Sequence, residues 1–154
     1  MGFIQAIIGL ALSARYSLTQ CTMAIRVVRL GSPRIQGEGV RLGTVRRPPR
    51  GVPKTKYAVL DYYDVWLPEL SPSADIVSWA MADEWTDKRW KDFARRYKKE
   101  MATPSARHLI ETLAALSNQT NLSVGCYCAD ESRCHRSLLR EILRDAGATI
   151  TGDT

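Results

Sequence analysis

The chain has 154 residues, of which 45% are hydrophobic and 25% are charged, and this is the composition of an ordinary globular domain. Its length corresponds to one domain that buries a core of its own, which excludes a small scaffold held together by disulfides. The net charge of +6 favours an anionic partner, but a basic surface alone does not identify one.

The first 22 residues differ from the rest of the chain. Residues 3–12 form an almost unbroken apolar run, far shorter than the roughly 20 residues that a membrane span requires. The run resembles the apolar part of a secretion signal, but no Lys or Arg precedes it. We expect residues 1–22 to be an upstream extension or a poorly packed segment, with the true start at Met23, and residues 23–154 to be one domain. A signal peptide and an extra packing helix are the alternatives.

Strands and loops alternate in the first half of the predicted domain. One strand is expected at residues 24–30 and another at residues 40–45, joined by the glycine-rich segment 31–39. The basic loop Arg46-Arg-Pro-Pro-Arg-Gly51 follows, and its two prolines exclude a helix there. Residues 57–67 are rich in aromatic residues and have a composition that favours a strand.

Three helices are expected in the middle of the domain. The first begins at Ser71-Pro72, with the serine as N-cap and the proline as first helical residue. The second spans residues 86–101, where one apolar stripe lies opposite a face of lysine and arginine. The third begins at Thr103-Pro104 and ends near Leu116. We interpret the basic face as solvated surface and the four tryptophans as core residues rather than as base-stacking platforms.

The segment from Cys126 to Arg136, CYCADESRCHR, holds three of the four cysteines, one of the two histidines and two arginines. The pattern before it predicts a buried strand at residues 122–127, and the pattern after it predicts an amphipathic helix that ends near residue 146. A strand, a polar turn and a helix form half of a βαβ unit. Ligands in such units gather at the carboxyl end of the strand, toward which the helix N–H groups point. The segment therefore marks the candidate site.

These elements predict an α/β fold, a single compact domain with a small, mostly parallel central sheet and helices packed on its faces. Cys126 and Cys128 are poorly placed to bridge each other, and Cys21 is left unpaired, which favours a reducing compartment. We therefore expect a cytoplasmic protein that does not engage a membrane.

Several motifs follow one another over residues 24–148. They are the segment 39–51, Asp61, Trp66, the helix start Leu70-Ser-Pro-Ser73, Cys128-Ala-Asp-Glu131 and Cys134-His-Arg136. Together they resemble domain-of-unknown-function family 488 (DUF488). The resemblance implies an α/β fold and a set of candidate positions, but no activity. The chain departs from the family pattern at Arg47-Pro48, where relatives have a Leu-Trp-Pro-like stretch, and by its additional Cys126.

A first hypothesis for the site is an anion pocket. Cys134, His135 and Arg136 would lie at a helix start, where free N–H groups and the helix dipole favour negative charge. Arg136 offers a planar fork for phosphate, and Arg50 and Arg47 of the basic loop could close the other side. The alternative is that Arg136 only pairs with Asp130 or Glu131.

A second hypothesis is thiol chemistry. Cys134 beside His135 and an arginine at a helix N-terminus has the surroundings that stabilise a thiolate. Cys128 could form a redox pair with Cys134 across the turn, although both thiols could equally be inert. A phosphatase loop would need five residues between cysteine and arginine, whereas Cys128 and Arg133 have four between them.

A metal site is the third hypothesis. Cys126, Cys128, Cys134 and His135 offer sulfur and nitrogen ligands for zinc, but four ligands from one short loop would be strained. The sequence therefore predicts no metal and no other cofactor.

The favoured function is recognition, with hydrolysis as a further step, of a phosphate-bearing ligand such as a nucleotide or nucleic acid. The candidate catalytic residues are Cys134, His135 and Cys128, and the candidate anion-binding residues are Arg136, Arg50 and Arg47. One alternative is a thiol-dependent redox or transfer enzyme that uses Cys134 with Cys128. Another is a binding module without catalysis, so whether the chain is an enzyme stays open.

Overall fold

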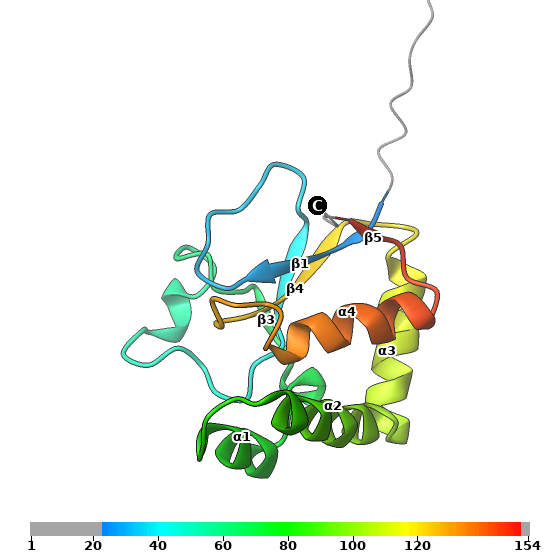
Figure 1. The fold of residues 1–154 in the computed structure, drawn as a ribbon. Helices are drawn as coiled ribbons and strands as arrows, with labels where there is room; N and C mark the ends of the chain where they lie inside the picture. The colour runs from blue at the N-terminus through cyan, green and yellow to red at the C-terminus, as the bar shows by residue number, and fades with distance from the viewer. Residues whose placement is uncertain (1–22, 152–154) are drawn as a thin grey trace, which may run out of the picture.

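Five parallel strands form the centre of the structure, a computed structural model that describes residues 23–151 (Figure 1). The sheet order is β3-β2-β4-β1-β5, and every neighbouring pair is parallel. The predicted α/β fold with a small parallel sheet is confirmed, while the expectations for residues 1–22 lie outside the described residues. The strands are β1 (Ile25–Arg29), β2 (Val40–Gly43), β3 (Val65–Trp66), β4 (Leu122–Cys126) and β5 (Ile150–Thr151).

The three inner strands are those that the apolar pattern predicted. β4 lies between β1 and β2, and all five of its residues are buried. Val124 is paired with Val27 on one side and with Leu42 on the other. This apolar row is the reason why a run of only five residues holds the middle of the sheet, since an inner parallel strand must be buried on both faces.

Four α-helices in the described part of the chain pack against one face of this sheet. Their buried side chains form one apolar cluster with Leu42, Leu122 and Val124, the strand residues that point to that face. No helix among residues 23–151 is long and apolar enough to cross a membrane. The helices are α1 (Ala74–Met81), α2 (Asp87–Met101), α3 (Pro104–Leu116) and α4 (His135–Asp145).

The first helix begins two residues later than predicted. Its N-cap is Ser73, whose hydroxyl accepts a hydrogen bond from the Ile76 N–H at 3.4 Å. Ser71 instead ends the preceding 3-10 turn, Pro68–Leu70, where its hydroxyl donates to the Pro68 carbonyl at 2.7 Å. The prediction of Ser71 as N-cap was wrong, since two serines flank the proline and the sequence alone does not say which hydroxyl is free.

The other face of the sheet is covered by irregular segments, residues 31–39 and 57–64. The strand expected within residues 57–67 reduces to β3, which has two residues. The aromatic residues before β3 instead pack onto the sheet. Tyr63 covers Gly43 of β2, and its ring lies edge-on to that of Tyr57 at 5.1 Å. The β-prone composition therefore reflects packing against a sheet and not membership of it.

Helix α4 has the position that the site argument required. It begins at His135, directly after the turn that follows β4, and ends at Asp145. Leu138, Leu139 and Leu143 are buried in the main apolar cluster. Its N-terminus is therefore fixed at the carboxyl end of β4, where the cysteine-rich turn lies.

Candidate functional site

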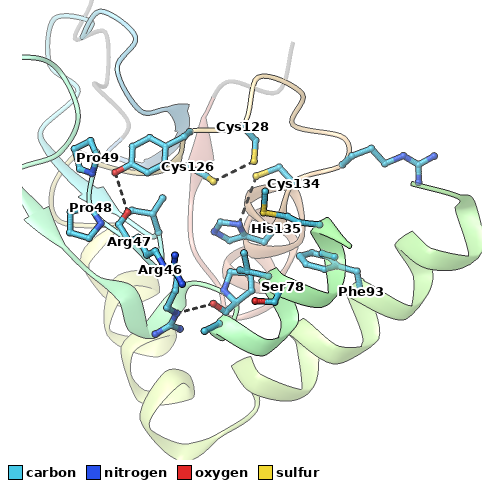
Figure 2. A pocket seen from close by; sticks show the side chains of 18 of the residues that line it. Arg46, Arg47, Pro48, Pro49, Ser78, Phe93, Cys126, Cys128, Cys134 and His135 are labelled. Carbon is cyan, nitrogen blue, oxygen red and sulfur yellow. Dashed lines mark hydrogen bonds between the residues drawn. The ribbon is translucent and has the colours of Figure 1, made fainter. Parts of the chain in front are cut away.

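A cleft of about 710 Å³ opens at the carboxyl ends of β2 and β4. One side is the basic loop 46–50 that follows β2, and the opposite side comes from α1 together with Trp85 and Phe93. The end of β4, the following turn and the first residues of α4 also line it (Figure 2). Segments far apart in the sequence meet here because β2 and β4 are neighbouring parallel strands.

Three thiols converge in this cleft. Cys126 ends β4, Cys128 lies two residues further in the turn, and Cys134 is the N-cap of α4. The sulfur atoms of Cys126 and Cys128 are 3.6 Å apart, and all three thiols are unbridged. Cys126 and Cys134 are buried and Cys128 is exposed, so Cys128 is the thiol that a ligand can reach.

His135 directs one ring nitrogen at the thiols (Figure 2). Its Nε2 lies 2.7 Å from the Thr44 carbonyl oxygen, and because a carbonyl only accepts, Nε2 carries the hydrogen. Nδ1 therefore presents its lone pair 3.8 Å from the sulfur of Cys134. Burial lowers the pKa of His135 to about 4, despite the bond to Thr44, so the ring is neutral at pH 7.

The three thiols do not titrate alike. Hydrogen bonds from the Cys126 and Cys134 thiols lower the pKa of Cys128, so Cys128 ionises most readily of the three. The hydrogen bond to Cys128 raises the pKa of Cys126, and the hydrogen bonds with Cys126 and Cys128 raise the pKa of Cys134. The thiol chemistry predicted for Cys134 stays a prediction, but Cys134 is 2% exposed and its pKa is raised, whereas Cys128 is exposed and its pKa is lowered.

Two arginines of the basic loop are available to a ligand. Arg47 and Arg50 line the cleft and are exposed, and neither guanidinium bonds another group among residues 23–151. Arg46 is instead held by the Pro72 and Ser71 carbonyls at 2.9 and 3.0 Å. Tyr127 fixes the loop by donating to the Arg47 carbonyl at 3.4 Å.

Arg136 lies apart from these groups. Its side chain is 4% exposed, its Nη2 donates to the Ala129 carbonyl at 3.4 Å, and its Nε is 4.0 Å from Glu131. It is not among the described residues that line the cleft. The structure thus brings Cys128, Cys134 and His135 together with Arg47 and Arg50, and places Arg136 behind them.

An aromatic side of the cleft was not predicted as part of the site. Trp85 is 41% exposed, lines the cleft and lies edge-on to Phe93 at 5.5 Å. The prediction that all four tryptophans are core residues was wrong for Trp85 and for Trp66, which is 43% exposed. Trp85 lies among polar residues just before the Thr86 N-cap, and this was the one signal in the sequence that could have distinguished it from a core tryptophan.

Comparisons with known proteins give one match. The model of DUF488-N3a, described as the active DUF488-N3 subclade, matches residues 25–147. No curated protein and no solved structure matches the chain significantly.

Proposed function

The chain belongs to the DUF488 family, as its motifs predicted, and we propose that its cleft recognises a nucleotide. One observation carries the proposal: the guanidinium groups of Arg47 and Arg50, which have no partner among the described residues, line a cleft whose other side includes the exposed ring of Trp85. Arginine forks bind phosphate oxygens in pairs, and exposed aromatic rings stack on bases.

The charges in the cleft indicate where the phosphate lies. The N-terminus of α4 carries about half a positive charge, but its first residues, 134–136, are buried, and the lowered pKa of Cys128 favours a negative charge beside it. A phosphate there would be repelled by that charge. We therefore place the phosphate at the rim, on Arg47 and Arg50, and not at the helix start.

Size and surface fit this assignment. The cleft volume of about 710 Å³ lies within the range of roughly 300–1,000 Å³ that holds small ligands. Stacking of a base on an aromatic side chain is worth about 1–3 kcal/mol, and Trp85 is exposed enough to provide it. A nucleotide offers a phosphate to the arginine rim and a base to Trp85, whereas inorganic phosphate interacts with the rim alone.

Replacing Arg47 or Arg50 by alanine should weaken nucleotide binding by roughly 1.5–3 kcal/mol, the value of a hydrogen bond to a charged group. Isothermal titration calorimetry with a panel of mononucleotides measures this as a loss of about 10- to 100-fold in affinity. The matched control is Arg107→Ala, because Arg107 is an exposed residue of α3 paired with Glu111 and does not line the cleft.

Three further measurements define this binding. Trp85→Ala should weaken nucleotide binding but leave the affinity for pyrophosphate unchanged. Product analysis in the same samples tests for hydrolysis.

Unchanged affinity in both arginine variants would contradict the proposal. Much tighter binding of a single-stranded oligonucleotide, with a steep salt dependence, would show that the ligand is a nucleic acid and not a nucleotide.

A second candidate function is thiol chemistry, favoured by the exposure of Cys128 inside the cleft. In metal-free protein, iodoacetamide should modify Cys128 first, and its rate should stay high below pH 8 because the thiolate is populated. Peptide mass spectrometry identifies the modified residue. Cys21→Ser serves as control, and modification of Cys128 no faster than that of free cysteine would contradict a reactive thiol.

A further inference from the structure

We propose that Cys126, Cys128, Cys134 and His135 bind one zinc ion at the floor of the cleft. The inference does not depend on the proposed nucleotide. It concerns the sulfur and nitrogen atoms below the ligand, whereas recognition was assigned to the arginine rim and the aromatic side.

The distances between the ligand atoms carry the inference. Tetrahedral zinc with Zn–S of about 2.3 Å and Zn–N of about 2.0–2.1 Å sets neighbouring ligand atoms about 3.6–3.8 Å apart. The Cys126 and Cys128 sulfurs are 3.6 Å apart, and the Cys134 sulfur is 3.8 Å from Nδ1 of His135. The ligand atoms of Cys126, Cys134 and His135 all lie within 4.8 Å of one another. Cys128 is not part of that group of three, so its side chain must move toward Cys134 and His135 to complete the tetrahedron.

The histidine has the hydrogen bonding of a metal ligand. Its Nε2–H donates to the Thr44 carbonyl at 2.7 Å, which leaves the lone pair on Nδ1 directed at the sulfurs. Histidines that bind metals commonly donate their other N–H to a backbone carbonyl in this way. Three thiolates and one imidazole are soft and borderline ligands, a set that selects zinc over magnesium or calcium.

Four ligands from one short loop were expected to strain that loop, but three of the four lie at the ends of a strand and a helix. Cys126 ends a buried strand, and Cys134 and His135 begin a helix that packs against the same sheet. The turn between them closes on itself through the hydrogen bond from the Cys134 N–H to the Glu131 carbonyl at 3.0 Å. Two rigid elements therefore supply three ligands, and only Cys128 comes from the turn.

The charge of the loaded site is balanced by its surroundings. Zn²⁺ held by three thiolates and a neutral imidazole has a net charge of −1, and any proton that a thiol still carries is released to solvent on binding. The positive end of α4 lies at Cys134. The buried Arg136 adds a positive charge that it shares with Glu131, and its Nε, 4.0 Å from that carboxylate, has no hydrogen-bond partner among the described residues. This gives Arg136 a supporting role behind the site instead of a contact with phosphate.

The test begins with the full wild-type chain. Elemental analysis should find one zinc per chain, and the cobalt-substituted protein should show thiolate charge-transfer and tetrahedral d–d absorption. The variants Cys126→Ser, Cys128→Ser, Cys134→Ser and His135→Gln should each weaken metal affinity by at least 100-fold, because even residues that only support a ligand contribute about 10- to 100-fold. Cys21→Ser and His108→Gln are the matched controls, and both should bind metal as the wild type does.

A second measurement keeps the inference testable where a variant fails to fold. In the Cys21→Ser background the exposed thiol, Cys128, should be unreactive toward a thiol reagent while zinc is bound and reactive after chelation. Arg50→Ala should lose nucleotide affinity and retain zinc, so that failure of one proposal is distinguished from failure of the other. Wild-type protein that holds no zinc and gives no cobalt spectrum overturns the inference.

Discussion

Replacing Glu38 by alanine should lower the free energy of unfolding by about 3–5 kcal/mol, because it leaves a buried arginine without its counter-charge. Arg41 is 0% exposed and Glu38 is 5% exposed. Glu38 accepts from Nε and Nη2 of Arg41 at 2.6 and 2.9 Å, and from the Ser123 hydroxyl at 2.7 Å. Denaturant unfolding at pH 7 measures the loss, and the melting temperature should fall by about 10 °C or more.

The control variant uses an exposed pair of the same type. Glu111 lies on α3, 3.6 Å from Arg107, and both side chains are 60% exposed. Glu111→Ala should change stability by no more than about 0.5 kcal/mol. If Glu38→Ala were equally mild, the buried pair would not be a major source of stability.

The pH dependence provides an independent check of the same carboxylate. Burial alone would raise the pKa of Glu38, but hydrogen bonds from Arg41 and Ser123 outweigh it and lower the pKa to about 2. The unfolded chain therefore takes up this proton at higher pH than the folded one. The stabilisation is complete above about pH 4.5 and is lost as pH falls toward 2.

Glu38→Gln isolates this contribution from other carboxylates, such as Asp64, whose pKa is also lowered. The difference in unfolding free energy between wild type and Glu38→Gln should shrink by about 3 kcal/mol between pH 5 and pH 2, since one pKa unit corresponds to about 1.4 kcal/mol. A constant difference over that range would show that Glu38 does not titrate with the lowered pKa.

Gly39→Ala is the second substitution with a large expected effect, a loss of about 3–5 kcal/mol in unfolding free energy from backbone strain and overpacking together. Gly39 has φ +79°, and a Cβ there would overlap the Asn121 carbonyl oxygen, which is backbone and cannot rotate away. Gly39 precedes Val40, which pairs with Leu122 where β2 meets β4. The alanine must therefore push these two strands apart.

Gly51→Ala is the matched control for backbone strain. Gly51 has φ +72°, but a Cβ there meets no atom within 4 Å, so only a cost of about 1–2 kcal/mol is expected. Thermal unfolding of both variants separates strain from steric overlap. Equal melting temperatures would mean that β2 and β4 adjust at no cost. Because β2 leads to Thr44 and the arginine loop, Gly39→Ala should also weaken nucleotide and metal binding in the fraction that folds.

Local patterns determined most of the fold. The apolar runs at residues 24–30 and 122–127 gave the inner strands, and the stripe from Trp90 to Met101 gave α2, because burial on one face imposes a period on the sequence. The pattern could not decide which of the two serines, Ser71 or Ser73, is the N-cap of α1. It also could not separate a strand within residues 57–67 from aromatic residues that pack onto a strand.

The sequence by itself also determined where the candidate site lies, because Cys128, Cys134 and His135 are close along the chain and a turn keeps them together. The tertiary structure alone decided which arginines join them. Pairing of β2 with β4 brings Arg47 and Arg50 across about 80 residues of chain to the cleft, whereas helix geometry turns the adjacent Arg136 into the interior. Likewise, the lone pair of His135 points at the thiols only because the Thr44 carbonyl, which lies 91 residues earlier, holds its other nitrogen.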